Sequence, residues 1–221
     1  MNLPNSITMS RIVMIPLLLW ILTPHFPWQG HGAQEIAASV LFILASITDG
    51  LDGYIARKRQ QITTLGMLLD PIADKIMVTS ALIALVAYGT PDHPAVVKVW
   101  IAVVIIGREF LISGLRSIAS SEGFTIEASD LGKLKTFLQI FSVVSAILAH
   151  HWDQWQFGFL IVPVRWIAIT AIYFTVLVSS ISAIDYFVGF WKKIDHASKD
   201  RRKKSFVLSR RKSAETPAGS Q

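Results

Sequence analysis

The sequence predicts an all-α polytopic membrane protein with six transmembrane helices and with cytoplasmic N- and C-termini. Composition is the first reason, because 52% of the 221 residues are hydrophobic and only 16% are charged. The mean hydropathy of +0.49 is the second. The third is that the apolar residues form long runs separated by short polar connections. Such a chain carries more apolar surface than a water-soluble core needs, so we expect its helices to lie in a bilayer.

Six apolar segments account for the six predicted helices. The first lacks both the basic region and the small-residue cleavage site of a signal peptide, so we expect it to stay in the protein. The last exceeds the roughly 20 residues that a bilayer requires, and Pro163 within it predicts a kink. The segments are 12–22, 36–48, 72–88, 96–106, 132–150 and 157–190.

The distribution of Lys and Arg predicts how these helices are oriented. Three connections, 24–34, 89–94 and 150–156, contain neither residue. The connections at the opposite ends of the helices and the C-terminal tail contain most of the basic residues. By the positive-inside rule, the termini and the basic connections face the cytoplasm.

The C-terminal tail differs in composition from the rest of the chain. Residues 1–191 are predicted to form the membrane domain, and residues 192–221 a basic, disordered cytoplasmic tail. The tail holds ten of the 21 Lys and Arg against three Asp and Glu. A basic run beside a membrane helix is typical of contact with anionic lipid headgroups, so we expect membrane lipids and no nucleic acid as its partners.

Four carboxylates stand between the second and third apolar segments. Asp49 and Asp52 are three residues apart, and Asp70 and Asp74 are four apart, so each pair projects from one face of its own helix. The polar stretch 58–64 allows the chain to turn, which would make the two helices antiparallel neighbours with their aspartates at the same end. The sequence therefore predicts a compact acidic pocket.

A divalent cation is the expected occupant of this pocket. Clustered carboxylates repel one another, and a bound cation relieves the repulsion. The ligands are oxygens and the chain has no Cys, which favours Mg²⁺ or Mn²⁺ over Zn²⁺. Because Mg²⁺ usually completes its shell with substrate phosphates, the pocket predicts a phosphorylated or nucleotide-linked substrate, with Arg57 ready to contact phosphate. Helix capping would explain one such Asp, but not four at regular offsets.

The same residues resemble a known family. Asp49-x-x-Asp52-Gly53-x-x-Ala56-Arg57, eight further residues and then Gly66-x-x-x-Asp70-x-x-x-Asp74 are similar, without a gap, to the signature of the CDP-alcohol phosphatidyltransferases. The resemblance implies a six-helix membrane bundle that uses a divalent metal to displace CMP from a CDP-linked lipid with an alcohol.

The resemblance also implies a role for each motif residue. Asp74 would be the general base that takes the proton of the acceptor hydroxyl. The metal would be held by Asp49, Asp52, Asp70 and Asp74. CDP-diacylglycerol would be bound by Asp49, Asp52, Gly53, Ala56, Arg57, Gly66 and Asp70.

A second, basic cluster lies at the predicted cytoplasmic ends of the fourth and fifth segments. It consists of Arg108, Arg116, Lys133 and Lys135. The guanidinium of Arg can form two parallel hydrogen bonds to a phosphate, and the ammonium of Lys is a compact positive charge, so both suit a dianionic phosphate. The alternative is that these residues are membrane anchors whose long side chains reach the interface, an interpretation that fits Lys133 and Lys135 better than Arg108.

The sequence around the basic cluster narrows the resemblance. The stretches G-R-E-F-L-I-S-G-L-R-S-I-A-S-S-E-G, from Gly107, and G-K-L-K-T-F-x-Q, from Gly132, resemble bacterial phosphatidylglycerophosphate synthases. That resemblance implies sn-glycerol 3-phosphate as the acceptor, CDP-diacylglycerol as the donor, phosphatidylglycerophosphate and CMP as products, a homodimer, and the inner membrane as location. The N-terminal stretch N-L-P-N-x-x-T-x-x-R-x-x-x-x-P, from Asn2, is also similar to these synthases. Its Arg is Arg11, whose place at the start of an apolar run indicates an interfacial anchor.

Two alternatives remain open from the residues. The acceptor could be another alcohol, such as inositol phosphate, serine or phosphatidylglycerol. More remotely, the chain could be a divalent cation transporter whose aspartates line an ion path, although acids on two adjacent helices near one interface fit that less well.

Overall fold

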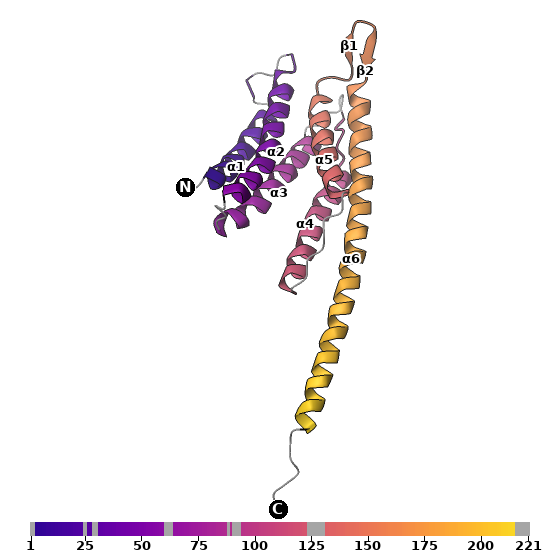
Figure 1. Cartoon of the computed structure of the whole chain (residues 1–221). Coiled ribbons are helices and arrows are strands. Elements are labelled where there is room, and N and C mark those ends of the chain that lie inside the picture. Colours follow the sequence, from indigo (N-terminus) through magenta and orange to yellow (C-terminus); the bar gives the residue numbers. More distant parts are fainter. Residues whose placement is uncertain are drawn as a thin grey trace, which may run out of the picture.

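Six α-helices and one β-hairpin make up the described part of the chain (Figure 1). The computed structural model describes the backbone of residues 3–23, 26–27, 31–59, 64–87, 89, 94–122 and 131–214, and the side chains of 9–23, 26–27, 31–48, 72–87, 89, 94–122, 134–156, 158–159 and 161–194. The elements are α1 (Leu3–Ile21), α2 (Ala33–Arg59), α3 (Thr64–Ala87), α4 (Val99–Ser121), α5 (Leu131–Leu148), β1 (Trp155–Phe157), β2 (Leu160–Val162) and α6 (Val164–Ala214). The predicted helical class and the number of helices are confirmed.

The helices pack in two groups that share one core. Helix α1 packs on α2 and α3, whereas α6 packs along α5 and α4, and contacts of α2 with α5 and of α3 with α4 join the groups. Figure 1 shows α1, α2 and α3 on one side of the molecule and α4, α5 and α6 on the other. Phe42, Met77, Ile101 and Ile147 are buried where the groups meet, one residue from each of four helices.

The turn between α1 and α2 is closed by a buried side chain. The amide of Gln34 donates hydrogen bonds to the carbonyl oxygens of Ile21 at 2.6 Å and Thr23 at 3.1 Å. Carbonyls at the end of a helix lack a helical partner, so Gln34 satisfies groups that would otherwise be buried without one. Gly32, just before α2, has a φ of 76° and packs against Trp152, a contact that joins this turn to the segment after α5.

The start of the last predicted segment is not helical. Residues 155–162 form an antiparallel hairpin in which Trp155 pairs with Val162 and Phe157 with Leu160. Gly158, with a φ of 62°, supplies the left-handed residue that this two-residue turn needs. The prediction of a helix from residue 157 is therefore wrong up to Pro163, which precedes the first residue of α6 instead of kinking a helix.

Helix α6 continues into the predicted tail. Its 51 residues extend beyond residue 192 to Ala214, and in Figure 1 its C-terminal part projects past the end of the bundle opposite the hairpin. The backbone of the tail is thus helical over most of a stretch that the composition predicts to be irregular. The division into a membrane domain and a tail at residue 191 stays a prediction.

Apolar side chains face outward on every helix. Among the described residues, the segment Val164–Ile194 of α6 is long and apolar enough to cross a membrane, and shorter apolar stretches are Met9–Ile21, Ala33–Thr48 and Leu134–Leu148. The following side chains, one from each helix, are more than half exposed: Val13, Ile47, Ile83, Val103, Phe137 and Trp166. Exposed apolar side chains on every helix are typical of contact with lipid.

Polar side chains, by contrast, lie inside the bundle. Thr175 and Ser179 of α6 and Ser142 of α5 are fully buried, as is Arg11 of α1. Arg11 lies on the same face of α1 as Ile15 and Leu18, the face that packs on α2 and α3. The interpretation of Arg11 as an interfacial anchor is therefore wrong, because its side chain points into the bundle.

We expect Gly32→Ala to destabilise the fold by at least about 2 kcal/mol, because Ala is strained at positive φ and its methyl group would overlap Trp152. Thermal unfolding in detergent measures the change. The matched control is Gly189→Ala in α6, where an added methyl group meets nothing within 4 Å and should leave stability equal or slightly higher. Equal melting temperatures for Gly32→Ala and wild type would contradict the packing described here.

Candidate active site

The four signature aspartates lie at similar distances along α2 and α3 from the connection between these helices. Asp49 and Asp52 lie ten and seven residues before the last residue of α2, and Asp70 and Asp74 lie six and ten residues after the first residue of α3. At 1.5 Å per residue, Asp49 and Asp74 are each about 15 Å along their helices from the connection, and Asp52 and Asp70 about 10 Å. That the two pairs of aspartates meet in one pocket stays a prediction.

Several predicted residues fall outside the described side chains. They are Asp49, Asp52, Gly53, Ala56, Arg57, Gly66, Asp70 and Lys133. Their roles remain predictions, and the site is built below from the predicted residues whose side chains are described, namely Asp74, Arg108, Arg116 and Lys135.

Asp74 lines a pocket at which four helices meet. Ser46 comes from α2, Asp74 from α3, Glu109 from α4 and Lys135 from α5, with Thr136 beside Lys135. The cavity of about 60 Å³ has room for a few water-sized groups, the scale of a phosphate. The structure thus brings together a predicted base and a predicted phosphate-binding cation from segments 61 residues apart in the sequence.

Glu109 joins two of the predicted cations. Its Oε1 accepts hydrogen bonds from Lys135 Nζ of α5 and from Arg108 Nη1, the latter at 3.2 Å. The carboxylate is 21% exposed, whereas the side chains of Arg108 and Lys135 are 9% and 10% exposed. Two nearly buried cations therefore converge on one oxygen at the edge of the pocket.

Arg108 is also fixed to α6. Its Nε donates to the carbonyl oxygen of Ser179 at 3.2 Å, and its Nη2 donates to Ser182 Oγ at 3.0 Å. The guanidinium thus spans α4 and α6 with three diverging hydrogen bonds, a geometry that the planar fork of Arg allows and that a Lys ammonium does not reproduce.

Arg116 lies farther from the pocket. Its guanidinium carbon is 5.9 Å from the centre of the Tyr186 ring, in a cation–π contact with α6. Arg116 is not among the residues that line the pocket around Asp74. Of the predicted phosphate-binding residues with described side chains, Lys135 is the one that faces the pocket directly.

The residues that orient these cations are not among the predicted site residues. Glu109 follows Arg108 directly in the sequence, and Ser179 and Ser182 stand within the longest apolar segment. A signal did exist, because polar residues inside an apolar helix usually face a partner within the protein. Which partner they face depends on how α6 packs on α4, and that information is not local.

The donor chemistry of this region suits a hard divalent cation. Carboxylate oxygens are the preferred ligands of Mg²⁺ and Mn²⁺, and α2 and α3 carry four aspartates at matching distances from their connection. Among the described side chains, which include only one of the four aspartates, no cluster of three or more His, Asp or Glu occurs. The fit therefore rests on the donor set and on the backbone positions.

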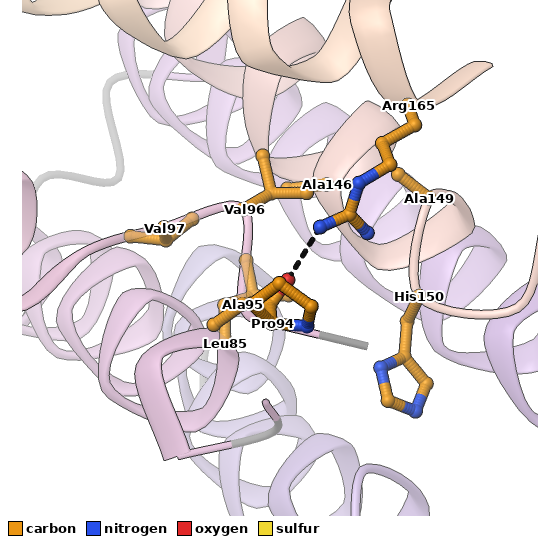
Figure 2. A pocket seen from close by; sticks show the side chains of 9 residues that line it. All are labelled: Leu85, Pro94, Ala95, Val96, Val97, Ala146, Ala149, His150 and Arg165. Atoms are coloured by element: carbon orange, nitrogen blue, oxygen red, sulfur yellow. Dashed lines mark hydrogen bonds between the residues drawn. The ribbon is translucent and has the colours of Figure 1, made fainter. Parts of the chain in front are cut away.

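A second pocket lies at the hairpin end of the bundle. Arg165 of α6 donates a hydrogen bond to the carbonyl oxygen of Pro94 at 2.7 Å, and His150 and Ala149 lie beside it (Figure 2). Its volume of about 10 Å³ holds one water at most. This pocket is too small for a substrate, and Arg165 serves to fasten α6 to the segment before α4.

The comparison with family models identifies one match. Residues 1–184 match the model described as CDP-alcohol phosphatidyltransferase. A CDP-diacylglycerol–glycerol-3-phosphate 3-phosphatidyltransferase from Bacillus subtilis (strain 168) is 39% identical over 201 residues, covering 87% of this chain and 97% of that protein. A protein of the same name from Rickettsia typhi (strain ATCC VR-144 / Wilmington) is 41% identical over 147 residues, covering 66% of this chain and 76% of that protein.

A solved structure has a similar fold. The crystal structure of Mycobacterium tuberculosis phosphatidylinositol phosphate synthase in complex with manganese and citrate matches with a TM-score of 0.60, covering 86% of this chain and 83% of that one. The sequences are 20% identical, so this similarity supports the arrangement of the helices.

We expect Arg108→Lys to destabilise the bundle by about 2 kcal/mol or more, because the ammonium cannot replace the contacts to Ser179, Ser182 and Glu109 together. Ser182→Ala removes one of these contacts and should cost less, about 1 kcal/mol. Thermal unfolding of the purified variants compares them. Equal losses for the two variants, or none for Arg108→Lys, would show that Arg108 does not fasten α4 to α6.

Proposed function

Because the chain belongs to the CDP-alcohol phosphatidyltransferase family, we propose that it transfers the phosphatidyl group from CDP-diacylglycerol to sn-glycerol 3-phosphate. The products are phosphatidylglycerophosphate and CMP. The names of the relatives support this reaction. The single structural observation that supports it is the pocket that Asp74 and Lys135 both line, because a carboxylate there could act as a base and an ammonium could bind an acceptor phosphate.

Asp74 acts as the general base. The acceptor's primary hydroxyl attacks the phosphorus that bears the diacylglycerol group. A new oxygen–phosphorus bond forms, the bond from that phosphorus to the bridging oxygen of the diphosphate breaks, and CMP leaves with the electron pair. The hydroxyl proton passes to the Asp74 carboxylate, which lies half-buried in the pocket.

The donor occupies the acidic ends of α2 and α3. Asp49, Asp52, Asp70 and Asp74 would hold Mg²⁺ or Mn²⁺, and the bound ion would supply positive charge against the diphosphate and the departing CMP. Gly53, Ala56 and Gly66 leave room for the nucleotide, and Arg57 contacts its phosphates. These roles follow from the family signature and from the positions of the residues in α2 and α3.

The acceptor phosphate is held by the basic cluster. Lys135 contacts it from the pocket wall, and Arg108, Arg116 and Lys133 add positive charge around it. A dianionic acceptor uses these charges, whereas a neutral acceptor such as serine would leave them unmatched. The cluster therefore favours glycerol 3-phosphate over serine. Inositol phosphate also carries a phosphate monoester, so only a direct assay distinguishes it from glycerol 3-phosphate as the acceptor.

The membrane arrangement follows from helix length and charge. Among the described residues, the segment Val164–Ile194 is long and apolar enough to cross the hydrocarbon core, and the shorter apolar stretches of α1, α2 and α5 would cross where the bilayer thins locally. The described basic residues at the hairpin end include Lys98 and Arg165. Nη1 of Arg165 lies 3.9 Å from Oδ1 of Asp153, so the two side chains form an ion pair. Most Lys and Arg lie at the opposite end, so that end, the aspartates and both termini face the cytoplasm in an inner membrane.

Two further expectations concern partners. The basic C-terminal part of α6 contacts anionic lipid headgroups at the cytoplasmic surface. A homodimer is expected from the family resemblance.

Replacing Asp74 with Asn should reduce the rate of CMP release from CDP-diacylglycerol with glycerol 3-phosphate by about 100-fold or more, because the amide cannot accept the hydroxyl proton. Purified enzyme in mixed micelles, with and without acceptor, gives the rate. Asp153→Asn, at the hairpin end and 59% exposed in its side chain, is the matched control and should leave the rate unchanged. Full activity of Asp74→Asn would remove the base assignment.

Chelation of divalent cations should abolish turnover, and Mg²⁺ or Mn²⁺ should restore it. The physical reason is that four carboxylates and a diphosphate in one pocket repel one another without a cation. Metal binding can also be measured without turnover, from the electron paramagnetic resonance spectrum of Mn²⁺ titrated into the protein. We expect bound Mn²⁺ in wild type and weaker Mn²⁺ binding in Asp70→Asn. Equal Mn²⁺ binding by the two proteins would exclude Asp70 as a ligand.

A further inference from the structure

Glu109 contacts both nearby cations of the acceptor site. Its Oε1 accepts hydrogen bonds from Lys135 on α5 and from Arg108 on α4. Arg108 is fixed in turn by Ser179 and Ser182 of α6. The carboxylate therefore links Lys135 to a rigid part of the bundle, and its position sets where the Lys135 ammonium lies in the pocket.

Lys135 shares its pocket with a second acidic residue. Asp74 and Glu109 are the two acids that line the described pocket, and Lys135 lines it with them. If the Glu109 carboxylate were lost, Asp74 would be the one carboxylate left in the pocket lining. The nearly buried ammonium of Lys135 would then turn toward Asp74, because a buried charge needs a partner. Lys135 would then lie against the proposed base and away from the acceptor phosphate.

We propose that Glu109 is a positioning residue for the acceptor, which holds Lys135 toward the phosphate subsite and away from Asp74. This inference rests on the proposed function, because it assumes that Lys135 contacts the acceptor phosphate. Glu109 acts through Lys135 and Arg108 and does not itself contact the substrate.

The test is steady-state kinetics of Glu109→Gln in the full-length protein, with CMP release as the readout. The amide keeps the size of the side chain but loses the charge that holds Lys135. We expect the KM for glycerol 3-phosphate to rise about tenfold or more, while the KM for CDP-diacylglycerol stays within about twofold. Glu109→Asp keeps the charge on a side chain one methylene shorter and should recover part of the loss. If Glu109→Gln does not fold, the same rise, of smaller size, is expected in Glu109→Asp.

Glu122→Gln is the matched control, because it makes the same chemical change at an exposed carboxylate one residue beyond the end of α4, and it should leave both KM values unchanged. An unchanged KM for glycerol 3-phosphate in Glu109→Gln would overturn the inference. A lower KM would also overturn it, because it would mean that the carboxylate competes with the phosphate. Equal increases in both KM values would point to a general structural role and would overturn it as well. Absence of CMP release by wild type with glycerol 3-phosphate would instead be a failure of the proposed function.

Discussion

Charged side chains inside an apolar helix bundle must be paired, and this requirement shapes the centre of the molecule. Removing an ion from water costs several kcal/mol even after relaxation, so an unpaired buried charge is not tolerated. The nearly buried cations Arg108 and Lys135 meet this requirement at one oxygen of Glu109. Because the three residues come from α4 and α5, and Arg108 also bonds α6, the pairing fixes three helices relative to one another.

The same constraint explains why the polar groups gather where they do. The outward faces carry apolar side chains on all six helices, which suits lipid, and Ser179, Thr175 and Ser142 turn inward. The hydroxyl of Thr175 donates to the carbonyl oxygen of Leu138, so it stabilises the contact between α6 and α5. Helices α2 to α5 enclose a pocket that is lined by a carboxylate, Asp74, and a cation, Lys135.

The sequence predicted most of the helices because apolar runs and polar connections are local signals. It failed at residues 157–163, where aromatic and β-branched residues fit a strand as well as a membrane helix, and only the turn at Gly158 decides between them. It also failed for Arg11, since one Arg at the start of an apolar run looks the same whether it faces lipid headgroups or the bundle. The aspartate signature was recognisable because its spacing is fixed along two adjacent helices. The contacts of Glu109 with Lys135 and of Arg108 with Ser182 span 26 and 74 residues, so they depend on tertiary packing that no local pattern contains.

The central claim is that the acidic ends of α2 and α3 and the pocket around Asp74 and Lys135 form one site. Anomalous diffraction at the manganese edge, from crystals of the protein grown with Mn²⁺ and glycerol 3-phosphate, tests it most directly. The account predicts an anomalous peak among residues 49, 52, 70 and 74, with the acceptor phosphate bound beside Lys135 in the adjoining pocket. An ion bound elsewhere, or a phosphate far from Lys135, would contradict it.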